Sequence, residues 1–136
     1  MSTSSSYRPT PLCVAARRGF EQHHSPWLVI GDFLDDWARF PDLSIRESLI
    51  QDEVLDSCDE EWHRWEAFMA AMVEHLTRKE GMPTPLWVFD SRWTLSVPWF
   101  LNPYWKLRAW MLVATPPAWK RRRIFGGDET MMIGRV

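Results

Sequence analysis

Apolar positions recur at steps of three and four along much of the chain, a spacing typical of amphipathic helices. The longest such stretch is residues 58–80, with acids at its start and Arg78 and Lys79 at its end, as the helix dipole favours. Gly81 and Pro83 then predict the C-terminal stop of this helix. Its apolar stripe consists of Trp62, Trp65, Met69, Met72, Val73 and Leu76.

The same spacing predicts three shorter helices before residue 58. Two Ser/Thr-Pro pairs, each an N-cap followed by proline at the first helical position, open helices over residues 11–18 and 26–40. We expect the first to end at Gly19 and a third to lie around residues 44–54. In the second helix the apolar side is Trp27, Ile30, Phe33, Leu34, Trp37 and Ala38.

The pattern changes at residues 82–103, where four prolines and three tryptophans exclude a long helix. We expect an irregular segment pinned by its aromatic residues, with a short extended piece at 86–89. Helices are expected over 102–114 and 118–123, and one helical turn in the C-terminal tail. In the helix over 102–114 the side chains expected to face the core are Tyr104, Leu107, Trp110 and Met111.

The predicted fold class is therefore mainly α, a compact bundle of four to six helices with a Trp/Pro-rich irregular segment packed on it. A length of 136 residues suits one domain, so we expect a disordered lead at 1–9 and a single helical domain at 10–136. Ten tryptophans are present, and each can bury roughly 150–250 Å². Six of them lie in residues 81–136, and we predict that most of the ten are core.

Several features predict a soluble protein of the cytoplasm without a cofactor. Cys13 and Cys58 match no metal-binding or redox spacing, which favours two reduced thiols. The first eleven residues lack the apolar core of a secretory signal. Every apolar run is far shorter than the roughly 20 residues that cross a bilayer.

Charge divides the chain into two unequal parts. Residues 1–80 hold 15 acids and 8 Lys/Arg, a net charge of −7, whereas residues 81–136 hold 3 acids and 8 Lys/Arg, a net charge of +5. Residues 32–61 alone hold 11 acids and 2 arginines. We interpret the chain as a non-enzymatic interaction module whose acidic helical surface binds a basic protein partner. The residues expected to bind this partner are Asp32, Asp35, Asp36, Glu60 and Glu61.

The basic C-terminal segment offers an alternative function. A run of cations next to an aromatic ring suits phosphates and exposed bases. The interpretation that we favour is that these cations form ion pairs, with the acidic residues of the 32–61 block or with a partner. The candidate nucleic-acid-binding residues are Trp119, Lys120, Arg121, Arg122 and Arg123.

A second alternative is a small-molecule enzyme, which would need a pocket that gathers the His23-His24 pair with the acids at 32–36. Phosphate loops, the Gly-x-Ser-x-Gly motif and paired Cys-x-x-Cys motifs are absent from the sequence. Glu60-x-x-His63 has the spacing found in di-iron bundles, but those need a second such helix. The sequence therefore predicts no catalytic residue and no metal site.

Residues 60–136 resemble the C-terminal module of a poorly characterised group of bacterial proteins. The resemblance lies in Met82-Pro-Thr-Pro-Leu-Trp-Val-Phe, in Arg92-Trp-Thr-Leu, in Pro98-Trp-Phe and in the run from Leu107 to Phe125. In that group the module follows a helix-turn-helix domain, and some members resemble antitoxins or regulators. This chain has no such domain, so the resemblance implies a module that senses a ligand or partner, of antitoxin or regulatory-partner type, and not a DNA reader.

Overall fold

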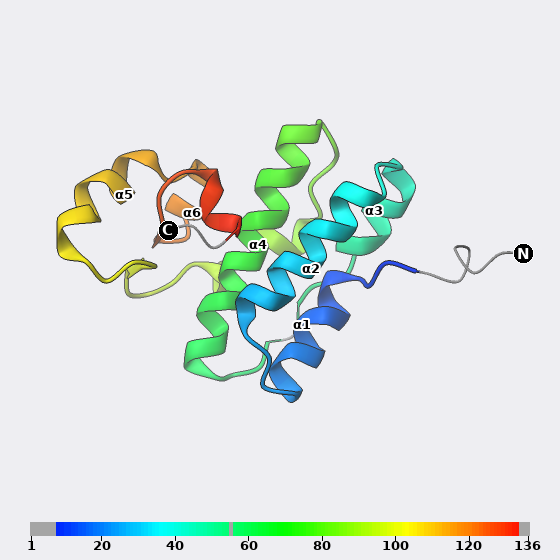
Figure 1. The fold of residues 1–136 in the computed structure, drawn as a ribbon, viewed down its shortest axis with the longest axis horizontal. Helices are drawn as coiled ribbons and strands as arrows, with labels where there is room; N and C mark the ends of the chain where they lie inside the picture. Colours follow the sequence, from blue (N-terminus) through cyan, green and yellow to red (C-terminus); the bar gives the residue numbers. More distant parts are fainter. Residues whose placement is uncertain (1–7, 55, 134–136) are drawn as a thin grey trace, which may run out of the picture.

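Helix α4 (Glu60–Glu80) runs through the middle of the molecule (Figure 1). The computed structural model describes residues 8–54 and 56–133, and this part of the chain is mainly helical. On one side of α4 lie α1 (Leu12–Glu21), α2 (Pro26–Arg39) and α3 (Leu43–Ile50). On the other side lie α5 (Arg108–Ala114) and α6 (Pro117–Lys120). The predicted mainly α bundle of four to six helices is confirmed.

Helix α4 is buried all round at its centre, because every residue from 66 to 74 is buried. The predicted apolar stripe is confirmed, yet the helix is a central rod and not an amphipathic surface helix. Two carboxylates, Glu66 and Glu74, lie within this buried stretch. The Asp59 carboxylate accepts the Trp62 N–H at 2.9 Å and caps the helix start. Gly81, at φ 69°, ends the helix in the left-handed conformation, as expected.

The first helix differs from the prediction at both ends. It begins at Leu12, one residue after the expected first helical position Pro11, and it continues through Gly19 to Glu21. Gly19 therefore does not stop the helix but lies buried where α1 crosses α2. A Cβ atom at this position would lie 2.5 Å from Val29 Cγ2 and 3.4 Å from the Trp62 ring. The absence of a side chain at Gly19 thus allows the two helices to approach closely.

Between α4 and α5 the chain forms short turns held by long-range contacts. These are the 3₁₀ turns η2 (Leu86–Phe89), η3 (Ser91–Trp93) and η4 (Trp105–Leu107) and the strand β1 (Trp99–Phe100). Strand β1 pairs in parallel with β2 (Ile124–Phe125), and a further turn, η5 (Glu129–Ile133), follows. Leu95 N–H donates to Arg122 O at 3.1 Å, which holds the segment on the C-terminal chain. The prediction of a short extended piece at 86–89 is wrong, because these residues form the 3₁₀ turn η2.

Eight of the ten tryptophans are core residues or pack against the core, so the prediction that most are core is confirmed. Two indole N–H groups donate to backbone carbonyl oxygens, one distant in the sequence and one nearby. Trp87 Nε1 donates to Ile50 O at 2.8 Å, and Trp93 Nε1 donates to Trp87 O at 3.1 Å. The exposed pair is Trp105 and Trp110.

The helix expected over 102–114 is shorter than predicted. It consists of η4 followed by α5, and of the four side chains expected in the core only Met111 is fully buried. Tyr104 and Trp110 are instead exposed. Of the expected disordered lead at 1–9, residues 1–7 lie outside the described part of the chain. Among the described helices, none combines the length and the apolar character needed to span a membrane.

Two glycines within helices give a matched test of the packing of α1 on α2. We expect Gly19→Ala to lower the free energy of unfolding by about 1–2 kcal/mol, since overpacking outweighs the gain in helix propensity. A Cβ atom on Gly31 in α2 would meet no atom of another element within 4 Å. Gly31→Ala should therefore raise the free energy of unfolding by about 0.5–1 kcal/mol. Urea unfolding followed by circular dichroism measures both, and equal shifts in the two variants would contradict the close approach.

Candidate functional site

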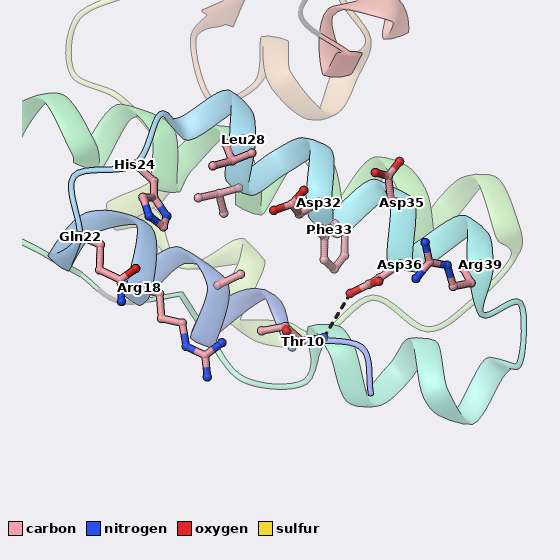
Figure 2. Close-up of a pocket in the computed structure, with 12 residues that line it drawn as sticks. Thr10, Arg18, Gln22, His24, Leu28, Asp32, Phe33, Asp35, Asp36 and Arg39 are labelled. Carbon is pink, nitrogen blue, oxygen red and sulfur yellow. Dashed lines mark hydrogen bonds between the residues drawn. The ribbon is translucent and has the colours of Figure 1, made fainter. Parts of the chain in front are cut away.

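A groove of about 580 Å³ lies between α1 and α2 and contains three of the acids predicted to bind a partner (Figure 2). Asp32 and Asp35 are exposed on α2. Arg18 and Arg39 line the same groove, so charges of both signs meet there. This part of the surface is therefore not an acidic face.

Asp36 is a correction to the predicted partner-binding set. Its side chain is buried, and its Oδ2 atom accepts the Thr10 N–H at 3.2 Å. The carboxylate thus ties the chain that enters α1 to helix α2 and does not face a partner. Glu60 and Glu61 are exposed at the start of α4, as predicted. Glu60 lines a different groove from Asp32 and Asp35, so the structure does not bring the five acids together.

The groove also contains His24, which the enzyme hypothesis would need beside the acids. The structure gives no hydrogen bond or ion pair that joins His24 to Asp32 or Asp35 among the described residues. His23 is exposed and does not line this groove. The structure therefore does not gather the His23-His24 pair with the acids in the way that the enzyme hypothesis expects.

The basic segment 119–123 is also different from the prediction. Trp119 is fully buried and Arg122 is buried, so neither is accessible to a base or a phosphate. The Trp119 ring lies against Phe68 and His75 of α4. Arg121 and Arg123 are exposed and Lys120 is half-buried. The five residues therefore do not form one nucleic-acid-binding surface.

Arg122 is buried because its partner is buried. Its Nη1 atom donates to Glu74 Oε1 at 2.7 Å and to Ala118 O, and its Nη2 atom donates to Val88 O. Burial lowers the pKa of Arg122 from its usual value, while the hydrogen bond and charge of Glu74 oppose this shift. An intramolecular ion pair was one of the expectations for this segment, but the acid is Glu74 and not a residue of the 32–61 block.

Glu74 also attracts the neighbouring cations through its second oxygen. Oε2 lies 2.7 Å from Arg121 Nη1 and 3.2 Å from Arg78 Nη2. These are charge contacts whose angles fall short of hydrogen-bond geometry. Three arginines therefore surround one buried carboxylate.

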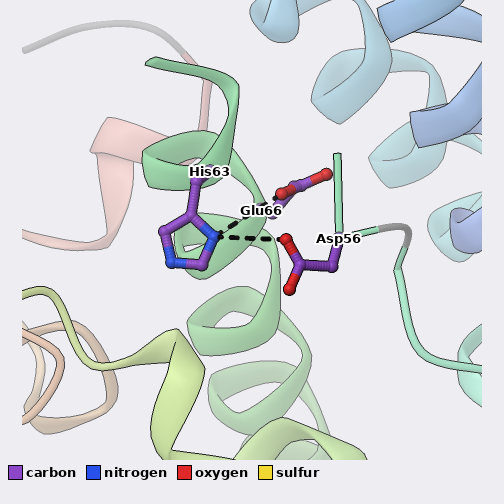
Figure 3. A group of neighbouring side chains, drawn as sticks. All are labelled: Asp56, His63 and Glu66. Carbon is purple, nitrogen blue, oxygen red and sulfur yellow. Dashed lines mark ion pairs between the residues drawn. The ribbon is translucent and has the colours of Figure 1, made fainter. Parts of the chain in front are cut away.

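Three side chains at the start of α4 form a cluster that the sequence did not reveal (Figure 3). His63 Nδ1 faces Glu66 Oε1 at 3.7 Å and Asp56 Oδ1 at 4.0 Å. One nitrogen or oxygen atom of each side chain is able to bind an ion, and these three atoms lie within 4.8 Å of one another. Two i, i+3 pairs include this histidine, and the pair that the fold completes is His63-x-x-Glu66 and not Glu60-x-x-His63.

Glu66 carries the largest electrostatic cost in this cluster. Its side chain is fully buried, and desolvation raises its pKa to about 7, with Asp56 adding to the shift. Ser57 N–H donates to Oε2 at 3.2 Å and lowers the pKa only in part. Near neutral pH this carboxyl group is therefore poised between its two protonation states.

The segment 104–113, which we call the aromatic arm, carries five large exposed apolar side chains within ten residues. Figure 1 shows that α5 lies farther from α4 than the other helices. Trp105 is 68% exposed and Val113 is 78% exposed. Lys106 and Arg108 lie between them, and the chain holds no acid from residue 91 to residue 127. The five side chains are Tyr104, Trp105, Trp110, Leu112 and Val113.

Comparison with known proteins gives no relative: no family model, no curated protein and no solved structure matches the chain.

Adjacent arginines test the structural role of the basic segment. Arg122→Gln leaves Glu74 without its main buried partner, so we expect the free energy of unfolding to fall by about 3 kcal/mol or more. Arg123→Gln removes only an exposed contact with Ser96 O at 3.1 Å and should cost less than about 1 kcal/mol. Urea unfolding measures the stability of both variants. Similar losses in the free energy of unfolding would show that Arg122 contributes no more to stability than Arg123.

Proposed function

We propose that this chain is a non-enzymatic interaction module that binds a protein partner through the aromatic arm. The observation that carries the proposal is the exposure of Trp105 in a chain whose other tryptophans are mostly core. Exposed clusters of large apolar side chains mark interaction sites, because a soluble domain otherwise covers them.

The residue types of the arm favour a protein over a nucleic acid. Tyr, Trp and Arg are enriched at protein interfaces. Leu112 and Val113 are exposed aliphatic side chains that gain nothing from stacking on bases, but they fill an apolar hollow well. With Lys106 and Arg108 beside them, the fitting partner surface is an apolar hollow with an acidic rim.

The arm is held in place by contacts with the rest of the chain. Met111 is buried beneath it, and Thr115 Oγ1 accepts the N–H groups of Gly126 and Gly127 at 3.0 and 3.1 Å. Lys120 Nζ donates to Val113 O at 3.1 Å. A surface presented by such contacts loses less conformational entropy on binding than a free loop does.

The acidic surface predicted from the sequence supports partner binding less well than the arm. Asp36 is buried, and Arg18 and Arg39 balance the charge around Asp32 and Asp35. That the partner is a toxin or a regulator of a bacterial cell stays a prediction, as does the resemblance behind it.

Photo-crosslinking tests the arm directly. A benzophenone side chain at position 105 should give a discrete protein adduct in the source cells, identified by mass spectrometry. The same probe at Leu43, an isolated apolar side chain that is 57% exposed, should give no such adduct. Against the purified partner, Trp105→Ala should weaken binding by about 30-fold, the loss typical of an interface hot spot.

Three outcomes would overturn the assignment to the arm. The first is an adduct with nucleic acid or lipid in place of protein. The second is a partner whose affinity does not depend on Trp105. The third is a double variant, Asp32→Asn/Asp35→Asn, that loses affinity for the partner while Trp105→Ala keeps it. That result would assign partner binding to the acidic residues. Because Trp105 is exposed, its replacement should leave the melting temperature of the chain nearly unchanged.

A further inference from the structure

Asp56, His63 and Glu66 come together because α4 begins just after a turn of the chain. His63 and Glu66 are one helical turn apart and face the same side of α4. Asp56 precedes the helix, and its Oδ1 atom accepts the Cys58 N–H at 3.3 Å, which holds the carboxylate against the helix start. Figure 3 shows the three side chains pointing toward a common centre.

The histidine ring is held with one nitrogen facing this centre. His63 Nε2 lies 2.8 Å from Arg92 O, and a carbonyl oxygen only accepts, so Nε2 carries the proton. The ring also stacks on Trp93 at 5.4 Å. Nδ1 is therefore the nitrogen that faces both carboxylates. A metal-binding histidine almost always donates its other N–H in this way, often to a backbone carbonyl.

Each carboxylate turns one oxygen toward the histidine ring and the other away from it. The outward oxygens are Glu66 Oε2, which accepts the Ser57 N–H at 3.2 Å, and Asp56 Oδ2, which lies 3.7 Å from Arg92 Nη1. Glu66 Oε1 and Asp56 Oδ1 face His63 Nδ1, and each also accepts one long hydrogen bond, from Ser57 Oγ at 3.5 Å and from the Cys58 N–H at 3.3 Å. The three facing atoms make up one nitrogen and two oxygens, which is a ligand set for divalent transition metals.

The separations fit an ion better than direct hydrogen bonds. At 3.7 and 4.0 Å the Nδ1–oxygen distances are too long for a hydrogen bond. Two carboxylate oxygens facing Nδ1 need a positive charge between them, either a proton on Nδ1 or a metal ion in its place. Two ligand atoms about 2.1 Å from a tetrahedral ion are about 3.4 Å apart, so the three atoms, which lie within 4.8 Å of one another, must draw together when an ion binds.

We propose that Asp56, His63 and Glu66 bind a divalent transition-metal ion such as Zn²⁺ or Co²⁺ through Oδ1, Nδ1 and Oε1. Three protein ligands leave one tetrahedral position for water. Asp56 is exposed, so the ion reaches the site from solvent on the side of this residue. The site lies on α4 and its preceding turn, so it is independent of the aromatic arm.

Titration of the metal-free full chain with CoCl₂ tests the site. We expect one Co²⁺ per chain, with visible absorption bands, and the same stoichiometry for ZnSO₄ by calorimetry. Zinc should shift the ¹⁵N resonance of His63 Nδ1 while the Nε2–H proton stays bonded. Glu66→Gln and His63→Gln should each weaken binding at least about tenfold. Glu66→Gln also removes a buried charge and keeps an acceptor for Ser57, so this variant is expected to fold.

Matched controls separate this cluster from other ligands of the chain. Glu60→Gln tests the other i, i+3 pair of His63, and His75→Gln tests a second histidine of α4; both should bind Co²⁺ as the parent chain does. His23→Gln/His24→Gln removes the exposed pair and should also leave binding unchanged. Absence of one-to-one binding in the parent chain, unchanged binding in a folded Glu66→Gln variant, or loss of binding in His23→Gln/His24→Gln would each overturn the proposal.

Discussion

The ion pair between Glu74 and Arg122 is the contact around which the C-terminal half of this molecule is arranged. Helix α4 is buried all round at its centre, and a carboxylate placed there is costly unless a cation accompanies it. Arg122 supplies that cation and also donates to Val88 O and Ala118 O. One side chain thus joins the central helix, the turn η2 and helix α6, which also pack together in the core through Val88 and through Trp119 against Phe68 and His75.

The same constraint explains the form of the proline- and tryptophan-rich segment. It has few backbone hydrogen bonds of its own, so its polar groups must find partners far away in the sequence. Leu95, Trp99 and Leu101 donate to the chain around Arg122–Phe125. The indole N–H of Trp87 reaches Ile50 O in α3, whereas that of Trp93 bonds within the segment, to Trp87 O. The segment is ordered by these pairings, and its position therefore depends on where Arg122 places the C-terminal chain.

The contacts that depend on residues far apart in the sequence are the part of the fold that the sequence does not predict. Helix α4 follows from local signals, namely its apolar spacing, Asp59 and Gly81. The basic run offers four similar cations, and nothing local distinguishes Arg122 from Arg123, because the difference is the buried Glu74 that lies 48 positions earlier. Gly19 gives a stop signal locally but serves a contact with α2. His63-x-x-Glu66 was visible as a spacing, whereas the approach of Asp56 and Arg92 O needed the fold.

Burial of most tryptophans gives meaning to the exposure of Trp105. Eight tryptophans lie in the core or pack against it, whereas Trp105 does not. The exposure of Trp105 is not a result of a loose segment, because Thr115 and Lys120 fix the C-terminal end of the arm. The cations of the arm lie against aromatic rings, Lys106 at 5.8 Å from the Trp105 ring centre and Arg108 at 4.7 Å from that of Phe100. Positive charge therefore accompanies the exposed aromatic side chains, and this is why the partner surface that we propose for the arm has an acidic rim.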